Sequence, residues 1–462
     1  MSSDVPLYDA AVIGGGLAGC AVLRALTLGG LRCVLLERGA DLLSGASKGN
    51  SAILHTGFDA PPGSLELRLM QAGRADYLAI RERMNLPLLE TDAVLAAWSE
   101  QELQRLPVIA DQAHRNGVDG VRPLARDEIF AKAPHLGPDV AGALLVPGEH
   151  LIDPWSAPHA YALQAVLNGA AILRRAEVRG ARREAGGWTL DTAAGPVRAG
   201  LVVNCAGNFG DRVEALHRDS PFTIKPRKGQ FVVFDKTARR FLSTIVLPVP
   251  NERTKGVVVT PTIFGNVLVG PTAEEQEERE IGTVDRAALE ALIGAAGRIV
   301  PALRDEPVTA TYAGIRPATQ FKDFVIEALP AERWIVAGGI RSTGLTAALG
   351  IGQHVAALVA EHFVGLKPLN DPAWPRMPNL AEHLPRDHQR PGRGDLVCLC
   401  EYVTADEIEA ALAGPLPAGD LGGLKRRTRA MMGRCQGFNC QARVCAMAEG
   451  RLLEAPEMPH AA

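Results

Sequence analysis

The sequence predicts an α/β protein in three parts: a parallel-sheet domain, a mixed-sheet α+β domain inserted into it, and a small helical C-terminal module. Three observations support this. Short apolar runs that end in glycines and lead into helical stretches occur near both ends of residues 8–365, as expected for buried parallel strands. Residues 222–270 carry the apolar runs of an antiparallel sheet. Five of the eight cysteines lie within residues 398–445.

The composition is that of a globular protein with more than one core. With 462 residues, 47% of them hydrophobic and 22% charged, the chain suits two or three domains. A net charge of −3 gives no reason to expect nucleic acid as a partner. The apolar stretch from Ala10 to Leu23 is too short to cross a bilayer, so we expect no transmembrane segment. No export signal is seen at the start, which predicts a cytoplasmic protein with reduced cysteines.

The elements follow one another in a readable order. Residues 8–13 form a buried strand, residues 17–28 a helix and residues 33–36 a second buried strand. Residues 81–147 mix helical stretches with loops. The later strands and helices are expected near residues 161–167, 172–173, 188–190, 201–204, 231–234, 257–260, 286–299 and 311–362.

Three glycines follow the first strand in the pattern G-x-G-x-x-G, namely Gly14, Gly16 and Gly19. Such glycines permit a tight turn and let the backbone approach a pyrophosphate at a helix N-terminus. Glu37 ends the second strand, where a carboxylate can accept a hydrogen bond from a ribose hydroxyl. This context predicts a Rossmann-like dinucleotide-binding domain, but the motif itself does not separate FAD from NAD.

Four further segments narrow the choice of cofactor: residues 47–58, 204–207, 312–317 and 337–346. Together with the first glycine loop they resemble the flavoprotein family of the D-amino-acid oxidase type. Within it, the likeness is to FAD-dependent glycerol-3-phosphate dehydrogenases and L-2-hydroxyglutarate dehydrogenases. The resemblance implies bound FAD, a discontinuous FAD-binding domain and a last glycine loop that touches the flavin. It implies these cofactor-binding residues: Gly14, Gly16, Gly19, Glu37, Arg38, Ser47, Asn50, Ser51, Val178, Ala206, Gly207, Gly339, Arg341, Thr343, Gly344, Leu345 and Thr346.

Two residues are candidates for catalysis. His55 lies within the flavin-proximal segment, and histidine is suited to accept a hydroxyl proton at neutral pH. A role restricted to packing or to a cofactor contact is the alternative. Arg316 lies in a segment that faces the substrate by resemblance, and a guanidinium holds a carboxylate or phosphate through two hydrogen bonds. Arg341 departs from the family pattern and suits either a second anion contact or a structural role.

The clustered cysteines predict an iron–sulfur site. Cys398 and Cys400 form a C-x-C pair, and Cys435 and Cys440 form a C-x4-C pair. Four thiolates in two close pairs match the ligands of a [2Fe–2S] cluster. Structural zinc is the rival, although zinc sites favour C-x2-C pairs. The two halves resemble a ferredoxin domain of the bacterioferritin-associated type (BFD), and residues 425–429 would place cations near the cluster.

The predicted domain boundaries follow from these motifs. The FAD-binding domain comprises residues 1–80, 148–215 and 308–367, and the substrate-binding domain comprises residues 81–147 and 216–307. Residues 368–394 contain six prolines and are predicted to be a linker, which lets the module dock or pivot. Residues 395–450 form the [2Fe–2S] domain.

The pattern as a whole predicts an FAD-dependent dehydrogenase. Its substrate would be a small anion, either a 2-hydroxy acid or a molecule like glycerol 3-phosphate, and electrons would leave through the cluster to a protein or quinone. The resemblance also implies a hetero-oligomer with a second flavoprotein or iron–sulfur subunit, or peripheral association with a membrane through a partner. Two alternatives stay open: a dehydrogenase for opines, sarcosine or hydroxyproline, and an electron-transfer subunit without a substrate of its own.

Overall fold

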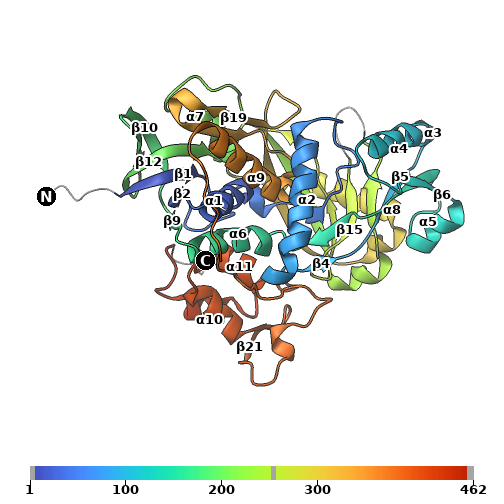
Figure 1. The fold of residues 1–462 in the computed structure, drawn as a ribbon. Helices are drawn as coiled ribbons and strands as arrows, with labels where there is room; N and C mark the ends of the chain where they lie inside the picture. Colours follow the sequence, from blue (N-terminus) through green and yellow to red (C-terminus); the bar gives the residue numbers. More distant parts are fainter. Residues whose placement is uncertain (1–5, 251–255, 455–462) are drawn as a thin grey trace.

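The computed structural model describes residues 6–250 and 256–454, and its body contains two large sheets (Figure 1). Residues 1–5 and 251–255, which fall in the predicted FAD-binding and substrate-binding segments, lie outside the described residues. Within the described part, no helix combines the length and apolar composition needed to span a bilayer.

The first sheet has eight described strands, and its centre is parallel. β1 (Leu7–Ile13) lies between β2 (Cys33–Leu36) and β12 (Gly195–Asn204), and β20 (Trp334–Gly338) pairs with β12. These strands are buried on both faces, which explains their continuous apolar runs. The sheet is completed by β9 (Ala171–Leu173), β10 (Val178–Glu184), β11 (Gly187–Thr192) and β19 (Val325–Leu329).

Helices cover one face of this sheet. α1 (Leu17–Leu28) packs against α6 (Ser156–Leu167) and α9 (Gly344–His362), and α2 (Leu65–Met84) packs against α9. A Cβ atom on Gly350 of α9 would lie 2.2 Å from the backbone of α2, so only glycine permits this close approach. On the opposite face, side chains of β1 and β2 pack with the tryptophans of β11 and β20.

The second sheet has nine described strands and forms the other half of the body. Its strands are β5 (Ala93–Ala97), β6 (Arg122–Leu124), β7 (Gly142–Val146), β13 (Lys225–Phe234), β14 (Ile245–Pro248), β15 (Val258–Pro261), β16 (Val267–Gly270), β17 (Glu274–Glu275) and β18 (Val308–Ala318). Its flanking helices are α3 (Glu100–Leu103), α4 (Leu106–Arg115), α5 (Arg126–Lys132) and α8 (Arg286–Ile299). α7 (Gly210–Glu214) lies beside β20 in the first half.

Two details of this sheet differ from the sequence-based expectation. Residues 81–147 contribute three strands to it, where helices and loops were expected, because these short strands pair with partners far along the chain. β18 pairs with β13 along its whole length, so the first part of the segment 308–367 joins the second sheet. The chain returns to the first sheet only at β19.

A small antiparallel sheet connects the two halves. It consists of β3 (Ile53–Leu54), β4 (Leu88–Leu89) and β8 (His150–Ile152). Leu54 pairs with His150, so the residue after β3 lies opposite the residue before β8. This register brings His55 next to Glu149, a residue 94 positions later in the chain.

The segment 368–394 packs along the body, although its composition predicted a linker. Met377, Leu380 and Ala381 are buried, and the side-chain amide of Asn85 donates a hydrogen bond to the Met377 carbonyl (2.7 Å). We call residues 368–394 the strap. It leads into the module, which contains β21 (Leu396–Cys398), β22 (Val403–Thr404), α10 (Ala405–Ala413), α11 (Leu421–Thr428) and α12 (Gln441–Ala448). Figure 1 shows this red module below the first sheet, with α11 next to α6.

The module is held to the body by a buried ion pair. Both carboxylate oxygens of Asp41 accept hydrogen bonds from Arg427, at 2.5 and 2.9 Å, and Asp41 is fully buried. Asp41 also accepts a hydrogen bond from the Gly419 N–H (3.0 Å), and Arg426 donates to the Leu42 carbonyl (2.9 Å). The loop that follows β2 is therefore clamped by α11.

Candidate flavin and iron–sulfur sites

The glycine loop lies where the parallel strands end. Ile13 of β1 pairs with Leu36 of β2 and Asn204 of β12, so these strands end at one edge of the sheet. Ligands of open α/β sheets bind at this edge. A Cβ atom on Gly19 would lie 1.8 Å from the Gly14 carbonyl oxygen, and one on Gly16 would lie 3.1 Å from Ser47 Oγ. The turn thus has no room for larger side chains and presents its backbone.

Glu37 closes this loop from the second strand. Its carboxylate accepts hydrogen bonds from the Gly15 and Gly39 N–H groups, both at 2.7 Å. Burial raises the pKa of Glu37, although these two amides oppose the shift. The next residue, Arg38, stacks its guanidinium 4.0 Å from the centre of the Phe209 ring and pairs with Glu280.

The segment 47–52 packs against β18 of the second sheet. Ser47 Oγ accepts a hydrogen bond from the Leu17 N–H at the start of α1 (3.0 Å), and Asn50 Oδ1 accepts one from the Ala52 N–H (2.8 Å). The Tyr312 hydroxyl donates to the Asn50 carbonyl (2.9 Å). Ser51 is partly exposed between these contacts.

The other predicted cofactor contacts lie near the same edge. Ala206 and Gly207 follow β12, and the backbone at Cys205 and Ala206 is so close to Gly14 that only glycine fits there. Val178 begins β10, two residues after an Ala176 N–H that donates to the Glu37 carbonyl (2.8 Å).

The last glycine loop joins β20 to α9. Gly339 has a φ of +66°, and Arg341 leads to Thr343, whose hydroxyl donates to the buried Glu66 (2.7 Å). Gly344 and Leu345 begin α9. Thr346 Oγ1 accepts a hydrogen bond from the His55 N–H (3.0 Å), so the segment 47–58 and the last glycine loop are in contact. The two glycine loops, Glu37 and the segment 47–52 therefore fit a bound FAD.

His55 and Glu149 form the clearest catalytic arrangement in the structure. The two atoms His55 Nδ1 and Glu149 Oε2 are 2.8 Å apart, and Glu149 is fully buried. Glu149 also accepts hydrogen bonds from the Thr56 N–H (2.7 Å) and hydroxyl (2.8 Å). Burial opposes ionisation, but His55 and then Thr56 outweigh it and hold the pKa of Glu149 below its usual value. An ionised Glu149 holds the proton of a neutral imidazole on Nδ1, which makes Nε2 the basic nitrogen.

Arg316 and Arg341 bring unpaired positive charge to the region. Arg316 lies within β18 and donates to the carbonyls of Thr272 (2.7 Å) and Lys228 (3.2 Å). Burial, with repulsion from Arg227 and Arg341, lowers the pKa of Arg316 to about 10, so it stays charged at neutral pH. Arg341 donates to the Lys322 carbonyl (2.9 Å). Among the described residues, neither arginine pairs with a carboxylate, which leaves both charges available to an anion.

The four predicted cysteine ligands converge in two pairs. Cys400 hydrogen bonds with Cys435, and Cys398 with Cys440. Backbone N–H groups, first that of Asn439, lower the pKa of the Cys435 thiol. Burial and the neighbouring Cys398 raise the pKa of Cys440 to about 12.

The loops that carry these thiols approach each other closely. A Cβ atom on Gly433 would lie 2.4 Å from Cys400 Cβ, so glycine is needed for the two loops to meet. In the described ranges, no three His, Cys, Asp or Glu side chains already have the arrangement of a single metal site. Four thiols brought together from two loops are the ligand set of a [2Fe–2S] cluster.

The basic residues 425–429 also bind partners in the structure. Arg426 and Arg427 bind the body of the protein, as described above, and Arg429 pairs with Glu401 (2.8 Å). Arg426 and Arg427 thereby hold the module on the body, whereas Arg429 pairs with the residue that directly follows Cys400. The expectation that this basic stretch places cations near the cluster stays a prediction.

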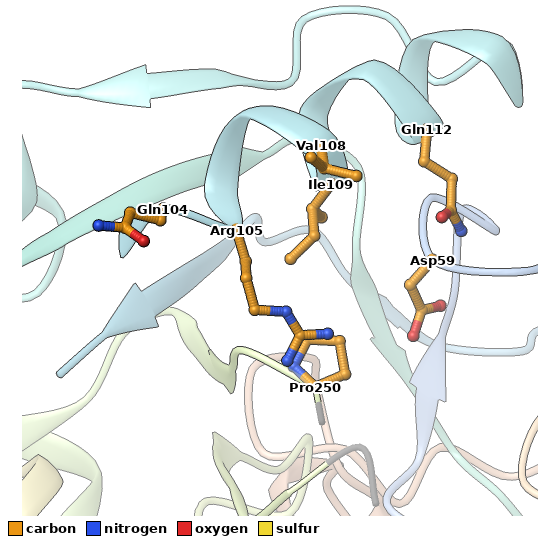
Figure 2. A pocket seen from close by; sticks show the side chains of 7 residues that line it. All are labelled: Asp59, Gln104, Arg105, Val108, Ile109, Gln112 and Pro250. Atoms are coloured by element: carbon orange, nitrogen blue, oxygen red, sulfur yellow. The ribbon is translucent and has the colours of Figure 1, made fainter. Parts of the chain in front are cut away.

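A surface hollow of about 290 Å³ lies apart from this site. Figure 2 shows it on α4, with Arg105, Val108 and Ile109 on one side and Pro250 opposite. None of the predicted site residues lines it.

Two functional residues were missed by the sequence analysis. Glu149 lies in a short turn between β7 and β8 and belongs to no recognisable motif, so only the register of β3 and β8 reveals it. Asp41 follows Glu37 by four residues, and no motif near it predicts its pairing with Arg427, 386 positions later.

The comparisons with known proteins agree with this geometry. Residues 9–358 match the family model of FAD dependent oxidoreductases, and residues 396–449 match that of the BFD-like [2Fe-2S] binding domain. The resemblance stated from the motifs is confirmed. The chain is 31% identical to a glycerol 3-phosphate dehydrogenase of Caloramator mitchellensis, over 95% of this chain and 93% of that protein.

Two further relatives are more distant. An L-2-hydroxyglutarate dehydrogenase of Caenorhabditis elegans is 27% identical, over 60% of this chain and 66% of that protein. The solved structure of a dithionite-reduced L-alpha-glycerophosphate oxidase from Mycoplasma pneumoniae, with FAD bound, superposes with a TM-score of 0.73 and 26% identity. It covers 79% of this chain and 97% of that one.

Proposed function

Because the chain belongs to the family of FAD-dependent oxidoreductases and has a BFD-like [2Fe–2S] domain, we propose that it is a glycerol 3-phosphate dehydrogenase. The relative that matches nearly the whole chain, including the C-terminal module, supports this substrate. A 2-hydroxy acid such as L-2-hydroxyglutarate is the second candidate, since Arg316 and Arg341 suit a carboxylate as well as a phosphate.

The observation that carries the proposal is the His55–Glu149 pair. Oxidation of a secondary alcohol removes a hydride from carbon and a proton from oxygen. Bound FAD supplies the hydride acceptor. Nε2 of His55 accepts the hydroxyl proton, and the buried carboxylate of Glu149 stabilises the imidazolium that forms. An amine that reacts as its free base needs no such base, so the pair favours an alcohol.

The arginines position the substrate for this step. Arg316 is fixed by backbone carbonyls and has no carboxylate partner in the described part of the chain, so its charge is directed at a ligand. In glycerol 3-phosphate, the phosphate is attached to the carbon that neighbours the one with the reacting hydroxyl. Binding the phosphate through Arg316 and Arg341 would therefore place that hydroxyl near His55.

The C-terminal domain provides the exit for electrons. Reduced FAD carries two electrons and a [2Fe–2S] cluster takes one at a time. Cys398, Cys400, Cys435 and Cys440 would hold the cluster. The acceptor in this proposal is another protein or a quinone, and a hetero-oligomer with a second redox subunit is part of it. The cytoplasmic location stays a prediction.

A substrate panel tests the proposal directly. Under anaerobic conditions, glycerol 3-phosphate should bleach the flavin absorbance fastest among glycerol 3-phosphate, L-2-hydroxyglutarate, lactate, sarcosine and hydroxyproline. Faster bleaching by L-2-hydroxyglutarate would select the second candidate. Bleaching only by the amines would contradict the alcohol assignment, and no bleaching at all would favour an electron-transfer subunit.

A further inference from the structure

A row of stacked groups connects the flavin-proximal loop to the cysteine module. The indole N–H of Trp155 donates to the Lys48 carbonyl (3.3 Å), and the Trp155 ring stacks on Phe264 at 5.7 Å with an interplanar angle of 12°. The guanidinium carbon of Arg429 lies 3.9 Å from the centre of the Phe264 ring. Each of these groups comes from a different part of the fold: the start of α6, the turn between β15 and β16, and the end of α11.

The module side of this row is rigid. Arg429 is 4% exposed and adopts a left-handed conformation (φ +68°) at the end of α11. Its Nε donates a hydrogen bond to Glu401. This glutamate directly follows Cys400 and is 1% exposed. Lys236 of the body binds the carboxylate of the same glutamate (3.4 Å), and Arg386 of the strap binds its carbonyl (3.1 Å). The row therefore ends one residue from a cysteine ligand.

We propose that Trp155 and Phe264 are the path along which electrons pass from the flavin site to the [2Fe–2S] cysteines. The inference rests on the internal electron transfer of the proposed function. Each passage oxidises the reduced flavin by one electron and reduces the cluster by one, and two passages follow each substrate oxidation. No atom moves along the row, and the flavin releases its protons to solvent. Electron tunnelling is faster through rings and bonds in contact than across gaps, and this row has no gap between Lys48 and Glu401.

The alternative is that the two rings only hold the module in place. Phe264→Leu separates these roles, since leucine keeps an apolar side chain but removes the π system. The matched control is Phe130→Leu, because Phe130 is also covered by an arginine, Arg126 at 5.2 Å, but lies on α5 away from both sites. Phe264→Tyr keeps the ring and should restore the path.

The experiment uses the full chain loaded with FAD and the cluster. The flavin is reduced by a light flash with a photoreductant, so the result does not depend on the identity of the substrate. Cluster reduction is followed by its visible absorbance. In Phe264→Leu it should slow by more than about tenfold, well outside the roughly twofold change of a substitution without a specific role. Phe130→Leu and Phe264→Tyr should match the wild type.

A second measurement, made on protein with or without cofactors, reports docking. Trypsin cleavage within the strap, which contains Arg376 and Arg390, should proceed at the wild-type rate in Phe264→Leu. Slow cluster reduction with unchanged cleavage supports the path. If strap cleavage becomes faster by the same factor by which cluster reduction becomes slower, Phe264 only holds the module in place. An unchanged rate of cluster reduction would also overturn the proposal. Failure of glycerol 3-phosphate to bleach the wild-type flavin would refute the substrate assignment alone.

Discussion

The ion pair between Asp41 and Arg427 offers a direct measurement of what holds the module to the body. Asp41 is fully buried, and only 8% of the Arg427 side chain is exposed. Arg427→Met keeps the length of the side chain but leaves a buried carboxylate without its cation. Removing one partner of a buried pair costs about 3–5 kcal/mol. Because 3 kcal/mol corresponds to about a 150-fold change in an equilibrium constant, we expect the undocked population to rise by about 150-fold.

Limited proteolysis of the strap measures this population. At low trypsin concentration the cleavage rate follows the fraction of open molecules. The control is Arg451→Met, whose pair with Glu409 lies within the module and is partly exposed, so docking should not change. The double variant Asp41→Asn with Arg427→Met removes the uncompensated charge and should recover most of the protection. Such recovery would show that the effect of Arg427→Met comes from the uncompensated charge of Asp41.

The pH dependence of docking has a defined sign. Burial opposes the ionisation of Asp41, but Arg427 and the Gly419 N–H outweigh it and hold the pKa of Asp41 below its usual value. A carboxylate with a lowered pKa stabilises the docked state above its undocked pKa, about 3.9, and loses this effect as the pH falls through the docked value. The cleavage rate, divided by that of an unstructured peptide at the same pH, should therefore be constant from pH 6 to 8, a range well above about 3.9, and rise in acid, where pepsin replaces trypsin. An Arg427→Met protein that is cleaved at the wild-type rate at pH 7 would refute the reasoning.

Three further predictions concern the active site and the cluster. His55→Ala should slow anaerobic flavin reduction by about 10²–10⁴-fold with FAD still bound, and Glu149→Gln should slow the same step; a normal rate in both would remove the pair from the mechanism. Arg316→Ala should raise KM for glycerol 3-phosphate more than it lowers kcat, and Arg316→Lys should restore little because the planar fork is lost. Metal analysis should give about two irons per flavin, iron should be lost in Cys398→Ser, and one equivalent of zinc without iron would contradict the cluster.

The motifs that local geometry determines were predictable from the sequence. Gly14, Gly16 and Gly19 are required by a turn in which a Cβ atom does not fit, and the first helix and second strand have the bounds that the pattern gave. The C-x-C and C-x4-C spacings likewise predicted a four-cysteine module, although the thiols meet across the two motifs, Cys400 with Cys435 and Cys398 with Cys440.

The parts that were missed depend on distant pairing. The strands within residues 93–146 are short, and their stability comes from neighbours in the second sheet that the local sequence does not reveal. The packing of the strap was not predictable because its prolines disfavour regular structure, whereas its burial depends on the side chains at Met377 and Leu380. Glu149 became visible only when the β3–β8 register was known.

The clamp on Asp41 has a consequence for how the protein is made. Asp41 is translated early, and its partner Arg427 follows 386 residues later. At 5–20 residues per second, the loop after β2 waits roughly 20–80 s on the ribosome for this partner. During that time the Asp41 carboxylate remains in water, and two later strands of the first sheet, β12 next to β1 and β20 next to β12, are also still to be synthesised. The nucleotide-binding half of the protein therefore reaches its final contacts only after α11 has been synthesised.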